Sequence, residues 1–211
     1  INLLENYPKA KRNVDERGSS KSENDRKIAR KFDKEFFDGS RDHGYGGFIY
    51  NPKFWQPVVP SFIDHFKITN EDSILDVGCA KGFMIFDFLE IMPGISVKGI
   101  DISNYAIENS LPSVKPFLEV GNAKSLPYDD KSVDIVISIT TLHNLEIDEC
   151  AKAIQEVERV SKRGSFITLD AYRNEEEKKR MESWNLTAKT MMHVDEWKAF
   201  FKKINYTGGY Y

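Results

Sequence analysis

The amino-acid sequence predicts an α/β fold in which helices cover both faces of an open, mainly parallel sheet. From residue 73 onward, short apolar runs of strand length alternate with segments of helical periodicity, and this alternation is typical of parallel strands joined by crossover helices. The clearest case is SILDVGCAKGFMIFDFLE at 73–90, where an apolar run meets a glycine-containing turn and a periodic apolar segment begins at once. A chain of 211 residues with 40% hydrophobic content is long enough to bury a substantial core.

The first elements are predicted to form a leader and a short helix. Residues 1–22 are polar and contain Gly18-Ser19-Ser20, so we interpret them as a flexible leader. The spacing of Ile28, Phe32 and Phe36 then predicts an amphipathic helix that ends at Gly39.

The next segment is expected to cover one edge of the sheet. Residues 41–57 are dense in glycine and aromatic side chains and predict a structured loop, and residues 58–66 predict a helix that leads into the sheet. The chain thus divides into a flexible polar leader at 1–22, a helical and aromatic cover at 23–67, and a core at 68–211.

Within this core the strands and helices alternate in order. Strands are predicted at 73–78, 96–101, 116–120, 134–139 and 165–171. Helices are predicted near 82–91, 104–110, 147–162, 174–184 and 194–204. Residues 205–211 resemble the start of a further, incomplete strand, and whether the chain continues beyond Tyr211 is left open.

Charge and cysteine content exclude several classes of protein. The net charge is −3, whereas residues 1–31 carry nine Lys or Arg against five acidic residues. We interpret this basic segment as a solvated tail, because it lacks interleaved aromatics, and the composition argues against a nucleic-acid partner. Cys79 and Cys150 form neither a disulfide framework nor a metal-ligand pattern. With no membrane-spanning run and no signal peptide in the sequence, we expect a cytoplasmic location, no membrane partner and no metal site.

The loop after the first strand carries the strongest functional signal. Small residues stand at Gly78, Ala80 and Gly82, which is one residue too tight for the G-x-G-x-x-G of a dinucleotide site. Lys81 is not followed by the Ser or Thr of a phosphate-binding P-loop. Asp76 ends the strand at the sheet edge where open α/β sheets bind ligands.

The pattern D-x-G-x-A-x-G from Asp76 to Gly82 resembles motif I of class I S-adenosylmethionine-dependent methyltransferases. That family usually has G-x-G-x-G, so Ala80 departs from the motif while keeping the loop small. The resemblance covers roughly residues 57–172 and implies a Rossmann-like three-layer sandwich with a mainly parallel, seven-stranded-type sheet. It also implies S-adenosylmethionine as the cofactor.

Family spacing assigns further residues to the methyl donor. Asp101, nineteen residues beyond Gly82, would accept hydrogen bonds from the ribose hydroxyls, and Ile102 would pack on the adenine. Asn122 stands where the family commonly has Asp; its carbonyl oxygen would hold the adenine amino group, and the Ala123 amide would meet a ring nitrogen. The predicted donor-binding residues are Asp76, Gly78, Cys79, Ala80, Gly82, Asp101, Ile102, Asn122, Ala123, Ser138 and Tyr50.

Acceptor residues are expected after the fourth strand, after the fifth strand and in the aromatic loop. His143 is the candidate general base or substrate-orienting group, and the alternative is that it caps or packs under the next helix. Arg173 would bind an anionic group, or pair with Glu175 or Glu176 on the surface. The predicted substrate-binding residues are His43, Tyr45, Trp55, Tyr172 and Arg173; for Trp55 an aromatic cluster that pins a helix onto the sheet is an equal alternative.

These features predict an enzyme, a methyltransferase that acts on an oxygen or nitrogen of a small metabolite, sugar-like or anionic. One alternative is a donor-binding regulatory protein without catalysis, and another is a nucleic-acid methyltransferase. A nicotinamide-dependent oxidoreductase is disfavoured by the glycine spacing. The identity of the acceptor, the use of a general base and the oligomeric state are left open.

Overall fold

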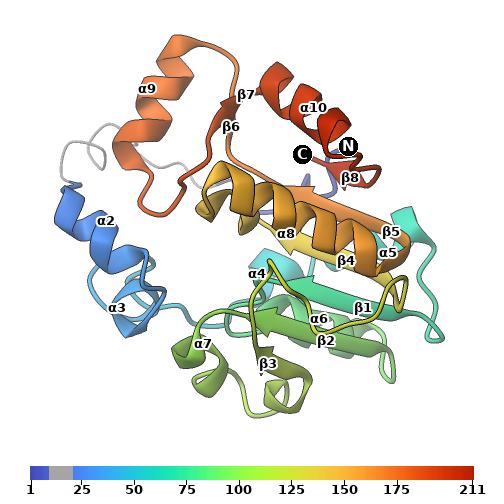
Figure 1. Ribbon diagram of the computed structural model, residues 1–211. Helices are drawn as coiled ribbons and strands as arrows, with labels where there is room; N and C mark the ends of the chain where they lie inside the picture. The colour runs from blue at the N-terminus through green and yellow to red at the C-terminus, as the bar shows by residue number, and fades with distance from the viewer. Residues whose placement is uncertain (10–20) are drawn as a thin grey trace.

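The computed structural model describes residues 1–9 and 21–211, and its centre is a parallel six-stranded sheet in the order β3-β2-β1-β4-β5-β8 (Figure 1). The strands are β1 Ser73–Val77, β2 Ser96–Asp101, β3 Leu118–Val120, β4 Val133–Ile139, β5 Ser161–Thr168 and β8 Gly209–Tyr210. The chain runs outward from β1 to β3 and then returns to β4, so the strand order reverses between β1 and β4. Ligands of open α/β sheets bind at such a switch point.

Helices cover both faces of this sheet, as predicted (Figure 1). One face carries α5 (Val59–Phe66) and α6 (Phe83–Ile91), and the other carries α8 (Ile147–Val160) and α10 (Val194–Lys203). Successive side chains of β1 point to opposite faces of the sheet, so alternate residues pack against the two helical layers. Ile74 packs in the core with Phe62 and Phe88, whereas Leu75 packs in the core with Ile154 and Trp197.

The N-terminal cover differs from the single helix that the spacing predicts. Its helices are α2 (Glu23–Ala29), α3 (Lys34–Phe37) and α4 (Pro52–Trp55). The chain breaks between the first two because Phe32 has φ 51, and the Asp33 side chain accepts from the Lys34 amide and starts a new helix there.

The predicted flexible leader at 1–22 is wrong for its first nine residues. Leu3 is 5% exposed and belongs to the core, and the Tyr7 ring packs against Phe54 and Trp55. The Ile1 nitrogen donates to the Tyr210 carbonyl oxygen at 3.0 Å. Apolar residues in the polar leader thus find a place on the sheet, while residues 10–20, including Gly18-Ser19-Ser20, lie outside the described residues.

The C-terminal part corrects a second prediction. The fifth strand ends at Thr168, and Ala171–Tyr172 forms β6, which pairs with β7 (Met192–His193) in a separate two-stranded sheet. The helix α9 (Glu175–Trp184) lies between these strands, and the tail forms β8 as expected. Remaining elements are the short helix α7 (Asn104–Glu108) and 3-10 turns at Lys115–Phe117 and Leu142–Asn144. Within the described residues, no helix has both the length and the apolarity needed to span a bilayer.

Candidate active site

The loop between β1 and α6 has an unusual backbone that lets the turn after β4 approach it closely. Gly78, Ala80 and Gly82 have φ of 86, 50 and 73, all in the left-handed region. A Cβ added at Gly78 would lie 2.1 Å from Oγ1 of Thr141. Glycine at this position therefore allows the loop and the turn after β4 to come into contact.

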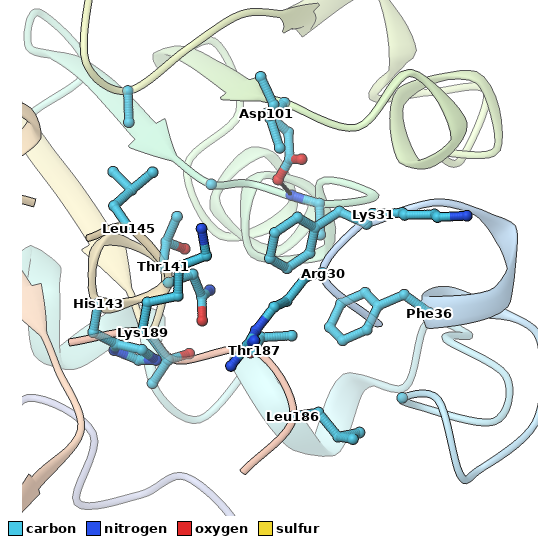
Figure 2. A pocket seen from close by; sticks show the side chains of 18 of the residues that line it. Arg30, Lys31, Phe36, Asp101, Thr141, His143, Leu145, Leu186, Thr187 and Lys189 are labelled. Carbon is cyan, nitrogen blue, oxygen red and sulfur yellow. Dashed lines mark hydrogen bonds between the residues drawn. The ribbon is translucent and has the colours of Figure 1, made fainter. Parts of the chain in front are cut away.

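Asp101 holds this loop in place. Its Oδ2 accepts from the Ala80 amide at 2.7 Å (Figure 2), and its Oδ1 accepts from the Ser103 amide at 2.8 Å. Burial raises the pKa of Asp101, and these backbone hydrogen bonds oppose the rise. Asp101 also lines the cavity described next. Since a carboxylate offers about four lone-pair sites, it keeps the capacity to accept further hydrogen bonds.

Four of the predicted donor-binding residues, Asp76, Cys79, Gly82 and Ser138, lie in or beside this loop but do not line the cavity described next. Burial raises the pKa of Asp76 to about 8, and the charge of the nearby Asp101 adds to the rise. Burial also raises the pKa of the Cys79 thiol, which lies against Gly99. Ser138 is fully buried and donates to the Val77 carbonyl oxygen at 2.8 Å, and Gly82 begins α6.

A cavity of about 1010 Å³ opens at the switch point of the sheet. The loop after β1, the end of β2, the turn after β4, the N-terminal cover and the segment 184–189 form its walls (Figure 2). The predicted site residues that line it are Gly78, Ala80, Asp101, Ile102, Asn122, Ala123, Tyr45 and His143. Asn122 Oδ1 already accepts from the Lys124 amide at 3.0 Å, which fixes the orientation of its side chain.

Three predicted residues of the aromatic loop do not line the cavity, because each of them is engaged elsewhere. The Tyr50 hydroxyl donates to Asp87 Oδ1 at 2.6 Å on that helix. Trp55 packs edge-on against the Tyr7 ring, so it belongs to an aromatic cluster, as the alternative interpretation of this residue expects. His43 lies between two acidic side chains, with Nδ1 3.2 Å from Glu35 Oε2.

The structure also places both predicted residues that follow β5 away from the cavity. Arg173 Nε lies 3.4 Å from Glu177 Oε2, an ion pair four residues apart on the exposed start of α9. This matches the surface-pair alternative, although the partner is Glu177. Tyr172 lies in β6, with Lys178 over its ring. Neither side chain lines the cavity.

His143 lines the cavity, yet both of its ring nitrogens face Asp170. Nδ1 accepts from the Asp170 amide at 3.2 Å, and Nε2 lies 3.5 Å from Asp170 Oδ2. Burial lowers the pKa of His143, while the Asp170 charge opposes this, so the ring is neutral at neutral pH. Because Nδ1 acts as acceptor, we assign the ring proton to Nε2. In this arrangement the lone pair is engaged, and His143 ties the turn after β4 to the end of β5.

Two arginines of the cover, neither of them among the predicted site residues, bind the segment 182–188, and one of them, Arg30, also lines the cavity. Arg26 donates to the carbonyl oxygens of Glu182, Ser183 and Asn185 at 3.1 to 3.4 Å. Arg30 donates to the Ala188 carbonyl oxygen at 3.4 Å. Their spacing of four residues on a predicted helix is a signal that both point to one side.

A third set of contacts fastens the cover to the loop after β1. Asp38 Oδ2 accepts from Lys81 Nζ at 2.6 Å and from the Tyr105 hydroxyl at 2.7 Å, and Asp38 Oδ1 accepts from the Phe48 amide. Lys81 is the residue inside the small-residue motif, and its side chain is almost fully buried. Through the contacts of Asp38, the position of the cover is coupled to the conformation of the loop after β1.

The fold and this loop define a class I S-adenosylmethionine-dependent methyltransferase domain, with S-adenosylmethionine as its cofactor. A family model described as "Methyltransferase domain" matches residues 68–209, and the chain belongs to this family.

Similar proteins agree with this assignment. The chain is 33% identical over 144 residues to a tRNA (carboxymethyluridine(34)-5-O)-methyltransferase of Arabidopsis thaliana, which covers 67% of the chain and 33% of that protein. It is 28% identical over 96 residues to a demethylmenaquinone methyltransferase of Roseiflexus castenholzii, covering 44% and 40% respectively. The chain spans less than half the length of these two curated relatives. The solved structure of the YcgJ protein from Bacillus subtilis has the same fold, with TM-score 0.55, 22% identity, and 69% and 66% of the two chains covered.

Proposed function

We propose that this domain transfers the methyl group of S-adenosylmethionine to an oxygen or nitrogen of a small acceptor enclosed in the same cavity. The observation that carries the proposal is that the loop after β1, residues 78–82, and the N-terminal cover line one cavity of about 1010 Å³. We call this loop the donor loop. Sites for single small molecules measure roughly 300 to 1,000 Å³, so this volume suits a donor and a small acceptor together.

The donor half of the cavity would be the end that contains Asp101. Asp101 would accept from the ribose hydroxyls, Ile102 would pack on the adenine, and Asn122 with the Ala123 amide would meet its polar edge. Ile102 is 55% exposed, which suits an apolar side chain that a bound ring would cover. The bound donor supplies an electrophilic methyl group on a sulfonium.

The protein's part in the transfer is then to position the acceptor. Holding two reactants in line can supply about 7–11 kcal/mol of the barrier. We assign His143 a positioning role, because its neutral ring already accepts from the Asp170 amide. The acceptor half would be the end of the cavity that contains Arg30, Asn144 and Lys189.

Calorimetry with S-adenosylmethionine and S-adenosylhomocysteine tests the donor half. Asp101→Ala should weaken binding by about 1–3 kcal/mol, since it removes a charged acceptor and also frees the Ala80 amide. The exposed Asp129→Ala is the matched control and should bind as the wild type does. Binding of neither compound to the wild-type protein would refute the proposal.

A second candidate is methyl transfer to RNA, which the tRNA methyltransferase relative and the basic residues of the cover favour. RNA binding would fall at least tenfold (about one log unit) between 50 and 200 mM salt if a few phosphates are neutralised. Fluorescence anisotropy with a short RNA oligonucleotide measures this. RNA binding of this kind, together with methylation of the RNA, would select this candidate over a small acceptor.

A further inference from the structure

A cationic wall distinguishes the acceptor half of the cavity. Seven Lys or Arg residues line the cavity, against three acidic residues. Three of these cations have carboxylate partners: Lys21 pairs with Asp42, Lys124 with Glu149, and Lys189 with Glu146. Four others have no ion-pair partner in the part of the chain that the structure describes, and all come from the cover: Lys27, Arg30, Lys31 and Arg41.

Three of these four cations come from α2 and the turn that follows it. Lys27 precedes Arg30 by three residues and Lys31 by four, so its side chain is a neighbour of both, and all three line the cavity. The negative end of the helix dipole favours cations near Arg30. The helix dipole does not explain why three cations line the same cavity. Their like charges repel one another unless an anion binds between them.

Arg30 is the member of this group that reaches inside. Figure 2 shows its side chain pointing toward Thr187, whereas Lys31 extends in the opposite direction. Arg30 Nε is buried and has no hydrogen-bond partner among the described residues, and its contact to the Ala188 carbonyl oxygen is long at 3.4 Å. A buried guanidinium N–H without an acceptor is costly, and a phosphate oxygen matches the fork of the arginine.

A second unsatisfied group lies in the same cavity. Asn144 Oδ1 is buried without a hydrogen-bond partner among the described residues, and it can accept from a hydroxyl or amino group. The cavity therefore offers cations for an anionic group and an acceptor for a neutral polar group.

We infer that the acceptor is a phosphorylated small molecule, whose phosphate groups bind Arg30 inside the cavity and Lys27 and Lys31 at its rim. This inference rests on the proposed function and names the substrate class of the same site. Cations spread from the interior to the rim suit more than one phosphate group. Asn144 would accept from a hydroxyl of the part that enters the cavity.

The closed cover favours a small molecule over RNA as the source of the phosphates. Arg26 ties α2 to the carbonyl oxygens of Glu182, Ser183 and Asn185. Asp38 ties the cover to the donor loop through Lys81. An RNA strand would have to displace the cover from these contacts to enter the cavity. A diphosphate is small enough to bind beneath the cover and along the rim of the cavity.

Calorimetric titration of inorganic pyrophosphate into the protein saturated with S-adenosylhomocysteine tests the inference. We expect saturable binding, weakened about three- to tenfold by Arg30→Gln and by Lys31→Gln, as for the loss of one charged contact. Lys34→Gln removes the same charge from an exposed residue of the cover outside the cavity, and it should bind pyrophosphate as the wild type does. Thermal unfolding of each variant shows whether the fold is kept.

Three results would overturn the inference. They are no saturable pyrophosphate binding, equal binding by the wild type and the double variant of Lys27→Gln and Lys31→Gln, and binding of the dicarboxylate malonate in preference to pyrophosphate. A short RNA oligonucleotide that binds more tightly than pyrophosphate and loses affinity in the same variants would identify RNA as the source of the phosphates. Failure of S-adenosylhomocysteine to bind would instead refute the proposed function, so the two failures are distinguishable.

Discussion

At the scale of single residues, Ala80 shows how the donor loop tolerates a side chain where the family motif has glycine. Its φ of 50 lies in the left-handed region, which costs a residue with a Cβ roughly 1–2 kcal/mol. The hydrogen bond from the Ala80 amide to Asp101 Oδ2 offsets this cost. Asp101 therefore shapes the loop before it can contact a ligand.

Asp76 should make the stability of the ligand-free protein depend on pH. Its native pKa is about 8 because of burial, whereas the ordinary value is 3.8. Between these values the native state holds a proton that the unfolded state has lost, so stability falls as pH rises toward 8. Urea unfolding at several pH values between 6.5 and 8 measures the slope. This window excludes His143, whose lowered pKa instead costs stability as pH falls below 6.5.

The isosteric Asp76→Asn variant supplies the control. It cannot ionise, so its free energy of unfolding should change less with pH over this window than that of the wild type. Asp101 keeps its own contribution in both proteins, since burial raises its pKa as well. Equal slopes for the two proteins would show that Asp76 is already ionised in the native state.

Sequence spacing located several single residues of the cavity but not their roles. Asp101, Ile102 and Asn122 follow strand ends, and parallel strands bring their carboxyl ends to one edge of the sheet. The engagement of His143 depends on the Asp170 amide, which is 27 residues away in the chain. No local pattern predicts such a contact, and the same holds for the long-range contacts that place Arg30.

At the scale of elements, the cover closes the cavity through a few hydrogen bonds. The helix α2 has seven residues and buries only Ala29, so its position depends on contacts such as those of Arg26. Periodicity predicted the strands and large helices of the core well, because they bury apolar residues at regular spacing. The break at Phe32 and the pairing of β6 with β7 depend on tertiary contacts and were not predicted.

Arg26→Ala should loosen the cover without unfolding the core. It removes the hydrogen bonds to three carbonyl oxygens of the segment 182–185, which are partly exposed and hence weaker than buried bonds. We expect faster amide hydrogen exchange in α2 and in this segment, and unchanged exchange in β1 and β4. Affinity for S-adenosylhomocysteine should stay within about twofold of the wild type, because Arg26 lies outside the cavity lining.

Arg180→Ala is the control for this experiment, because it removes an exposed arginine of α9 beside the same segment. Its exchange pattern should match that of the wild type. Accelerated exchange throughout the sheet in Arg26→Ala, or no change in α2, would contradict the assignment of Arg26 as a fastening of the cover.

At the scale of the whole molecule, three distant parts of the chain meet around one cavity. One wall comes from residues 21–45, mostly of the cover, the second from the donor loop in the first half of the sheet, and the third from residues 184–189. The sheet order explains why the donor loop lies at this edge. Only the packed structure shows that the first and last of these parts touch.

The two ends of the described chain also lie together, since Ile1 donates to the Tyr210 carbonyl oxygen. We therefore expect the N-terminal residues to contribute to the stability of the whole domain. Leu3 is 5% exposed and packs in the core shared by α5, α6 and the sheet. Leu3→Ala should lower the free energy of unfolding by about 2–5 kcal/mol, as expected for a truncated core leucine. Urea unfolding followed by tryptophan fluorescence and by far-UV circular dichroism measures this, and the two transitions should coincide.

The exposed Glu5→Ala is the control and should change the free energy of unfolding by less than about 0.5 kcal/mol. If Leu3→Ala were equally silent, residues 1–9 would not be part of the core, and the leader predicted from their polarity would be the better description.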